Sequence, residues 1–224
     1  MRGNPTITDE DRPTRDRLLA AGMALIAERG FNGVTVGEIE AAVGLAPRRG
    51  ALYKHFPSKR ALVEEAMEER ISGVADLSDQ VAWFASPEAV ADPRSSLRLI
   101  ARVALDELDR EKHINQIIEK DGRRFPELRD RMREAMVEPG FRYAEEIFGA
   151  WVRATHDADS SLESDRATGI DVAAVATVLL SALVHHRRHA WLLDKPPHGV
   201  DTDRFLDAWV DVTMRALATQ EVAS

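Results

Sequence analysis

A short basic stretch near the N-terminus carries the side chains with the clearest chemistry in this sequence. Arg48 and Arg49 are followed by Gly50, Tyr53 and Lys54. An arginine guanidinium can donate two parallel hydrogen bonds to the O6 and N7 atoms of guanine in the major groove of DNA. A glycine beside the arginines would let the backbone approach the duplex closely. These residue types therefore make Arg48 and Arg49 candidates for direct base contact, with Gly50 next to them.

The segment before the arginines is predicted to be a short helix. Thr35 and Glu38 have the Thr-x-x-Glu spacing of a capping box, so we expect the helix to begin at Val36. Gly44 can adopt the left-handed conformation that commonly ends a helix. The helix would bury one apolar side, formed by Val36, Ile39 and Val43.

A second short helix is predicted to carry the arginines. Pro47 suits its first position, where the missing N–H would be unpaired in any case, and Pro57 would stop it after Phe56. Leu52 and Phe56 would face the core. Two short helices joined by a tight glycine turn are typical of a DNA-reading helix-turn-helix. On this pattern alone, an ordinary helical hairpin with a solvated basic face is the alternative.

The stretch resembles the DNA-binding signature of the TetR family of bacterial regulators. One feature departs from the signature: seven residues, LAPRRGA, separate Gly44 from Leu52, a longer turn than is usual in the family. The features that match are Thr35–Val36, Ile39, Gly44, Leu52–Tyr53, Phe56, the exit Pro57-Ser58-Lys59, and Ala61–Leu62.

The resemblance implies an all-α fold in two parts. A three-helix DNA-binding head would occupy residues 1–60, and a ligand-binding and dimerisation body would occupy residues 61–224. The first thirteen residues are polar and contain two prolines, so we expect residues 1–13 to form a flexible arm.

The resemblance also implies contacts to DNA phosphates. His55 stands at a position that is commonly aromatic in the family, and both a phosphate contact and simple packing are open for it. The positions that match phosphate-holding positions of the family are Thr35, Tyr53, Lys54 and Lys59.

The charge of the chain is divided between these two parts. The whole sequence has a formal net charge of −8. Residues 1–60 hold ten Lys and Arg against seven Asp and Glu, so this part carries +3 and the remainder carries −11. A local basic patch is enough to neutralise DNA phosphates, while an acidic body would discourage non-specific binding. The chain contains no cysteine, which excludes disulfides and thiolate sites.

Helical periodicity continues through the body, without strand-like alternation of useful length. We expect about nine helices in the whole chain, with a loop at residues 86–93 and an acidic loop at residues 155–169. Pro139 and Gly140 should kink or divide one long helix. The helices outside the helix-turn-helix are expected at residues 14–29, 58–84, 94–110, 113–120, 126–154, 170–193 and 203–219.

The last two helices resemble the dimerisation pair of the TetR family. Small side chains within residues 170–193 allow close helix packing, so we expect a symmetric four-helix interface with a second copy. Such a homodimer would present two recognition helices one DNA turn apart, on a palindromic operator. The alternative is that both helices complete the core of a monomer.

TetR-family bodies generally hold a small-molecule pocket, so the resemblance implies a repressor that an unknown effector releases. One alternative is a DNA-binding dimer that has no effector and whose body only dimerises. Aromatic residues at helical spacing can also be ordinary core residues. The residues that could line a pocket are Trp83, Phe84, His113, Gln116, Ile117, Glu119, Phe141, Tyr143, Phe148, Trp151 and His185.

Neither a metal site, a cofactor nor an enzymatic activity is predicted. His185 and His189 lie one helical turn apart, which suits a metal, but no acidic residue lies beside them and Arg187–Arg188 would repel a cation. No nucleophile stands beside an activating base. A helical enzyme that uses His113 and Glu119 as acid and base is the rival from a different class.

No signal peptide or membrane span is predicted. The N-terminal sequence MRGNPTITDEDRP has no apolar segment. The most apolar run, residues 172–184, is interrupted by Thr177 and Ser181 and is followed by histidines and arginines. We therefore expect a cytoplasmic protein without a membrane partner.

Overall fold

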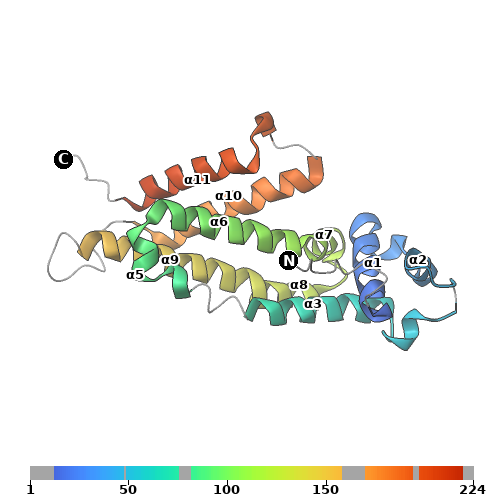
Figure 1. The fold of residues 1–224 in the computed structure, drawn as a ribbon. Coiled ribbons are helices and arrows are strands. Elements are labelled where there is room, and N and C mark those ends of the chain that lie inside the picture. Colours follow the sequence, from blue (N-terminus) through green and yellow to red (C-terminus); the bar gives the residue numbers. More distant parts are fainter. Residues whose placement is uncertain (1–12, 48, 76–81, 158–169, 194–196, 219–224) are drawn as a thin grey trace, which may run out of the picture. The chain divides into compact units, whose positions relative to one another are not determined.

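Helices make up all the regular structure in the described part of the chain, which confirms the predicted all-α fold (Figure 1). The structure is a computed structural model that describes residues 13–47, 49–75, 82–157, 170–193 and 197–218. The predicted arm and the acidic loop lie largely outside these ranges. Among the described helices, none combines the length and the apolar character that a membrane span requires.

The helices follow one another in the order shown in Figure 1. The N-terminal elements are α1 (Thr14–Arg29), the 3₁₀ turn η2 (Phe31–Gly33), α2 (Val36–Ala42), the 3₁₀ turn η3 (Leu52–Lys54) and α3 (Lys59–Ala75). They are followed by α5 (Pro87–Ala91), α6 (Pro93–Arg110), α7 (Lys112–Asp121), α8 (Pro126–Met132), the π-helical turn η4 (Arg133–Val137) and α9 (Glu138–Asp157). The chain closes with α10 (Val172–Leu193), the 3₁₀ turn η5 (Pro197–Gly199) and α11 (Thr202–Leu217).

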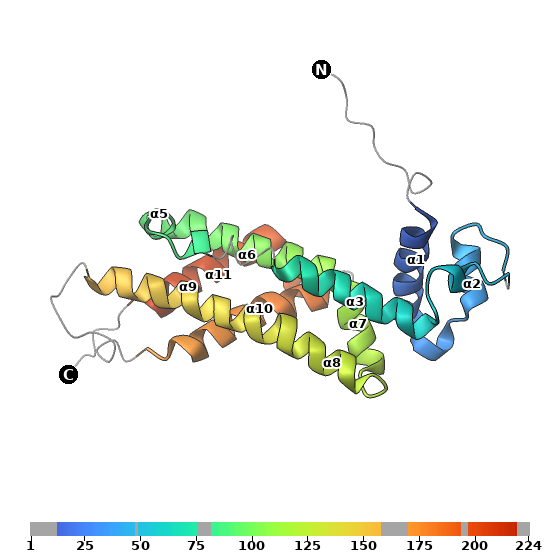
Figure 2. The same cartoon turned by 90° about the horizontal axis from the view of Figure 1, so that it is seen from below.

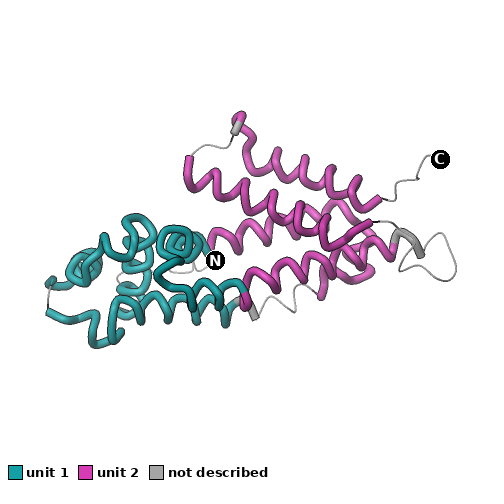
Figure 3. The backbone as a smooth tube through the Cα atoms, turned by 180° about the vertical axis from the view of Figure 1, so that it is seen from behind, with its two compact units in different colours: residues 1–73, 111–133 teal, residues 74–110, 134–224 magenta. Residues whose placement is uncertain are grey.

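The chain forms two compact units, which Figure 3 colours separately. Unit 1 contains residues 1–73 and 111–133, and unit 2 contains residues 74–110 and 134–224. Most of α3, together with α7 and α8, therefore packs with the first three helical elements, although these helices lie beyond residue 60 in the sequence. The functional boundary at residue 60 stays a prediction.

Helix α1 is the central element of unit 1, because it packs against α2, η2 and α7. A Cβ atom at Gly22 would lie 2.8 Å from the side chain of Leu62, so a glycine at this position lets α1 approach α3 closely. The predicted core positions Ile39, Leu52 and Phe56 are all fully buried.

The C-terminal end of α1 is held by the C-terminal end of α7. The ammonium group of Lys120 donates to the carbonyls of Ala27 and Glu28, and the carboxylate of Asp121 accepts the backbone N–H of Phe31 at 2.7 Å. The last carbonyls of a helix have no partner within the helix. The two residues of α7 therefore satisfy backbone groups that would otherwise need water.

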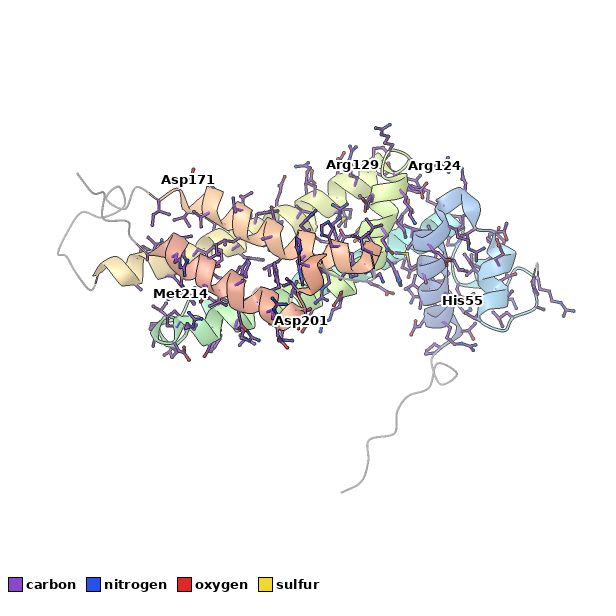
Figure 4. All side chains as sticks on the ribbon, turned by 90° about the horizontal axis from the view of Figure 1, so that it is seen from above. His55, Arg124, Arg129, Asp171, Asp201 and Met214 are labelled. Atoms are coloured by element: carbon purple, nitrogen blue, oxygen red, sulfur yellow. The ribbon has the colours of Figure 1, made fainter. Side chains whose placement is uncertain are left out.

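In unit 2, α6, α9, α10 and α11 lie side by side (Figures 1 and 2). The indole N–H of Trp209 on α11 donates to the carbonyl of Leu179 on α10 at 2.9 Å. Asp171 and Asp201 cap the starts of α10 and α11, where Figure 4 labels them. One edge of α11 is joined to α6 by ion pairs at helical spacing, namely Arg94–Asp211, Arg98–Asp207, Arg98–Asp203 and Arg102–Asp203.

Two expected boundaries differ in the structure. The loop expected at residues 86–93 contains α5, because Ser86 caps its first turn and Pro87 occupies a position that needs no N–H donor. The expected break at Pro139 lies one turn earlier, in η4, because a proline cannot donate to the carbonyl four residues before it. Within the helix expected at residues 58–84, α3 (Lys59–Ala75) and residues 82–84 are helical, and residues 76–81 between them lie outside the described residues.

The buried indole of Trp151 allows a test of the unit 2 core. Its Nε1 atom donates to the carbonyl of Phe84 at 3.0 Å, and the residue is 3% exposed. We expect Trp151→Phe to lower the free energy of unfolding by about 2 kcal/mol, because it leaves that carbonyl unpaired and creates a cavity. Urea unfolding at one protein concentration, followed by circular dichroism, measures the change.

Trp83→Phe is the matched control, because Trp83 is 49% exposed. It should change the free energy of unfolding by less than about 0.5 kcal/mol. Equal destabilisation by the two substitutions would contradict a stabilising role for the Trp151 hydrogen bond.

Candidate nucleic-acid interface

The predicted capping box at the start of α2 is confirmed. The hydroxyl of Thr35 accepts the N–H of Glu38 at 3.3 Å, and the Glu38 carboxylate accepts the N–H of Thr35 at 2.7 Å. These bonds, together with Arg29 at 2.8 Å, hold the pKa of Glu38 below its ordinary value. Thr35 is exposed, and its hydroxyl also donates to the Glu38 carboxylate at 2.8 Å.

The prediction of a second helix from Pro47 to Phe56 is wrong. No helix begins at Pro47 in the described residues, and the only helical element between α2 and α3 there is the 3₁₀ turn Leu52–Lys54. Gly50 has a φ of +70°, which lies outside the helical region and interrupts any helix that would begin at Pro47. Gly44, with a φ of +76°, ends the α2 segment as predicted.

The residues expected to contact DNA lie along this segment with their side chains exposed. Arg49, Tyr53, Lys54 and His55 are exposed, whereas Leu52 and Phe56 between and after them are buried. Figure 4 labels His55 just before α3. In the described residues, the exposed four make no hydrogen bond or ion pair through their side chains, which leaves their donors available. Arg48 lies outside the described residues, and Gly50 packs beside Tyr53, where a Cβ atom at the glycine would lie 3.7 Å from the ring.

The ammonium group of Lys59 is bonded within the protein. Its Nζ atom donates to the carbonyls of Phe31 and Val34 and lies 4.2 Å from the centre of the Phe31 ring. Burial lowers the pKa of Lys59, and the nearby Arg124 acts in the same direction. The expected phosphate contact of Lys59 stays a prediction, but this geometry favours a role in holding the segment that leads into Thr35.

The residues expected to line a ligand pocket are distributed over both compact units. His113, Gln116, Ile117 and Glu119 lie on α7 in unit 1, and Ile117 is buried in the core. A surface hollow in unit 1 contains Glu119, and its other lining residues are Ile118, Lys120, Gly122, Arg123 and Arg129.

The remaining pocket candidates lie in unit 2, and several of them are core residues. Phe84, Phe148 and Trp151 are buried in one apolar cluster with Trp209, whose ring centre lies 6.4 Å from that of Phe148. Trp83 is largely exposed, while Phe141 and Tyr143 on α9 and His185 on α10 lie at or near the surface. The pocket itself stays a prediction.

The histidines of α10 have different environments. The rings of His185 and His189 lie 4.1 Å apart near the surface, whereas His186 is buried and stacks on Phe205 at 3.9 Å. Burial, Arg187 and His189 lower the pKa of His186. Within the described residues, no three metal-ligating side chains gather in one place.

Glu40, a buried carboxylate that reaches the segment between α2 and α3, is not among the residues expected from the sequence at this site. Its Oε1 atom accepts the backbone N–H of Leu52 at 3.1 Å. A signal was present, because Val36, Ile39, Glu40 and Val43 occupy positions i, i+3, i+4 and i+7 of one helical face. Lys120 and Asp121, which hold the end of α1, were also missed, and nothing in the local sequence indicated their distant partners.

The environment of Lys59 leads to a test. We expect Lys59→Met to lower the free energy of unfolding by about 2 kcal/mol, because two part-buried carbonyls lose a charged donor. The dependence of DNA affinity on salt should keep its slope, because the Lys59 ammonium group already binds two backbone carbonyls. Chemical unfolding and DNA titrations at several salt concentrations measure the two quantities.

Lys54→Met is the control, since Lys54 is exposed and should affect the salt slope rather than the stability. A shallower salt slope for Lys59→Met, with unchanged stability, would instead establish Lys59 as a phosphate contact.

Comparisons with known proteins agree with this geometry. Residues 18–66 match the family model described as bacterial regulatory proteins, tetR family. The chain is 34% identical over 65 residues to the HTH-type transcriptional repressor KstR2 of Mycolicibacterium smegmatis, which is 29% of this chain and 31% of that protein. It is also 34% identical over 92 residues to the HTH-type transcriptional regulator AcrR of Shigella flexneri, covering 41% of this chain and 40% of that protein. The chain thus spans less than half the length of these relatives.

Solved structures share the fold over almost the whole chain. A TetR-family transcriptional regulator from Mesorhizobium loti, with 18% identity, has a TM-score of 0.58 and covers 90% of this chain and 95% of its own. The TetR-family regulator PfmR from Thermus thermophilus, with 25% identity, has a TM-score of 0.50 and covers 91% of this chain and 97% of its own. Residues 18–66 thus carry the match to the tetR family, and the fold along the chain is one that TetR-family regulators of known structure share.

Proposed function

We propose that this protein is a homodimeric transcriptional regulator that binds a palindromic DNA operator, and that it is a repressor which a small molecule releases. The observation that carries the proposal is a group of exposed donors, without partners among the described residues, on the face opposite the buried Leu52 and Phe56. The name of the similar KstR2, a transcriptional repressor, supports repression over activation. The exposed donors are Arg49, Tyr53, Lys54 and His55.

The proposed contacts divide into those that read bases and those that hold phosphates. Arg48 and Arg49 are assigned to guanine edges, because a guanidinium can bond O6 and N7 together, and Gly50 allows close approach. Tyr53 and Lys54 are assigned to phosphates, with Thr35 at the start of α2. Lys59 is assigned a supporting role, because its ammonium group binds carbonyls in front of Thr35.

Dimerisation is proposed through the outer faces of α10 and α11. Val178 and Leu192 on α10 are 67% and 77% exposed, and Val212 on α11 is also exposed. Large exposed apolar side chains on two neighbouring helices are typical of an interface that another molecule covers.

The acidic edge of α11 is already used by its ion pairs with α6, so the other edge of α11 is available to a partner. A symmetric partner is the simplest occupant for such a face. The exposed residues at helical spacing on α10 are Ala174, Val178, Ser181, His185, Arg188 and Leu192.

Release by a small molecule is proposed to act through α7. This helix belongs to the same compact unit as α1 and α2, and its residues Lys120 and Asp121 bond to backbone groups at the end of α1. A displacement of α7 would therefore be transmitted to the head by direct hydrogen bonds. For release, the ligand must bind the DNA-free conformation more tightly than the DNA-bound one, and DNA must weaken ligand binding by the same factor.

The second candidate is a DNA-binding dimer without an effector. The burial of Phe84, Phe148 and Trp151 in one apolar cluster favours it, because these aromatic rings then stabilise the body and line no pocket. In that case the body would serve only to pair two heads.

The division between base and phosphate contacts can be tested with DNA selected by the protein from a randomised duplex library. We expect Arg49→Ala to lower the preference for the selected sequence over a scrambled one by about tenfold or more, because one bidentate base contact is lost. Lys54→Ala should weaken both DNAs alike and reduce the salt slope by about one unit. Fluorescence anisotropy at several salt concentrations measures both effects.

Failure of the wild-type protein to enrich any sequence would argue against the proposed function itself. Equal losses from both substitutions on every DNA would instead leave DNA binding intact and refute only the assignment of roles.

The dimer interface can be tested by placing charge on the exposed apolar face. We expect Val178→Glu combined with Val212→Glu to convert the dimer to a monomer at micromolar concentration, because two buried carboxylates per chain would lack partners. Leu99→Glu on α6 is the control, because Leu99 is comparably apolar and 46% exposed. Sedimentation velocity measures the mass. A double variant that stays dimeric would place the interface elsewhere.

A further inference from the structure

The segment that presents Tyr53 and Lys54 lacks the support that a full helix would give it. Residues 45–51 form no helix where they are described, so η3 begins without a preceding helical turn. Ala51, which precedes η3, makes no side-chain capping bond. The N–H of Leu52 is nevertheless fully buried with its residue and needs an acceptor.

That acceptor is supplied from another helix, by Glu40 of α2. The Glu40 side chain is 0% exposed, and its Oε1 atom accepts the Leu52 N–H at 3.1 Å across twelve residues of sequence. A buried carboxylate is costly unless hydrogen bonds compensate for its lost hydration. An apolar side chain would fill the same space without that cost, so packing alone does not explain a glutamate at this position.

Glu40 also holds the other end of the same segment. Its backbone carbonyl accepts the N–H groups of Val43 and Leu45, at 3.3 and 2.9 Å. Arg17 donates to the Val43 carbonyl at 2.6 Å and so fixes the end of α2 to α1. One residue therefore bonds to the chain where the segment leaves α2 and again where it enters η3.

We propose that Glu40 is the positioning residue of the segment between α2 and α3, which is the segment proposed to read DNA. Its hydrogen bonds take the place of the missing first turn of a recognition helix. Glu40 keeps Leu52 inside the core. Tyr53 and Lys54, which follow Leu52, are thereby held with their side chains exposed. The bonds at both ends also limit the conformations of residues 45–47 and 49–51, which include Arg49. This role rests on the proposed DNA-binding function, since positioning matters only where the segment meets a duplex.

The test compares two substitutions of Glu40 of similar size. Glu40→Gln keeps an oxygen that can accept the Leu52 N–H, whereas Glu40→Met removes it. The first readout needs no DNA: hydrogen exchange of the Leu52 amide, measured by NMR in the full-length protein. We expect Glu40→Met to speed this exchange by at least about tenfold relative to Glu40→Gln, because only the methionine leaves the amide without an acceptor.

The second readout is sequence preference, measured as the ratio of affinities for a duplex selected by the wild-type protein and for a scrambled duplex. We expect Glu40→Met to lower this ratio about tenfold while affinity for the scrambled duplex changes less, because the charges that hold phosphates remain. Glu40→Gln should retain most of the preference. Glu28→Met, which removes an exposed carboxylate elsewhere on the head, is the charge-matched control and should shift both affinities alike.

The two readouts decide the proposal together. It is supported when amide exchange and sequence preference change together, and it is overturned when either changes without the other. If Glu40→Met does not fold, Glu40→Ala takes its place under the same criterion, because alanine also removes the acceptor oxygen. If the wild-type protein selects no sequence, the proposed function fails, whereas selection with unchanged behaviour of the folded Glu40 variants refutes only the role of Glu40.

Discussion

Unpaired backbone groups at the ends of short helices are the constraint on which the DNA-binding unit depends. A helix as short as α2 has few internal hydrogen bonds, so side chains must satisfy the backbone groups at its ends. Glu38 and Thr35 do this at the start of α2, Lys59 binds carbonyls just before it, and Lys120 binds carbonyls at the end of α1. The unit is small, and these bonds fix its parts where apolar packing alone would permit sliding.

This constraint also explains why α3 and α7 pack with the head. Lys59 opens α3 and Asp121 closes α7, and both bond to the short segment around Phe31. The segment between α1 and α2 is therefore clamped by helices that lie far along the sequence. The proposed release by a ligand needs such direct bonds, because a coupling between sites requires contacts that differ between two states.

Local patterns were sufficient to predict the fold, and they failed where a distant partner decides the conformation. The capping box of Thr35 and Glu38, the turn at Gly44 and the buried faces all followed from neighbouring residues. The recognition helix was wrong because Pro47 permits a helix but Gly50 interrupts it, and no propensity could predict which would prevail. The partners of Lys59 and Lys120 lie at least 25 and 92 residues away, beyond any local pattern.

A short 3₁₀ turn, η3, stands where a full recognition helix was expected, and this affects how the proposed sequence preference can arise. A full recognition helix presents several side chains from one rigid surface, whereas η3 presents only Tyr53 and Lys54 on its exposed side. In the proposed function, base reading then falls to the arginines before η3, and ordering a free loop on DNA would reduce the affinity gained. Bonds at both ends of that loop lower this cost before DNA arrives. The buried carboxylate of Glu40 can thus hold a loop whose arginines are proposed to read bases, whereas an apolar side chain at this position could not accept the Leu52 N–H.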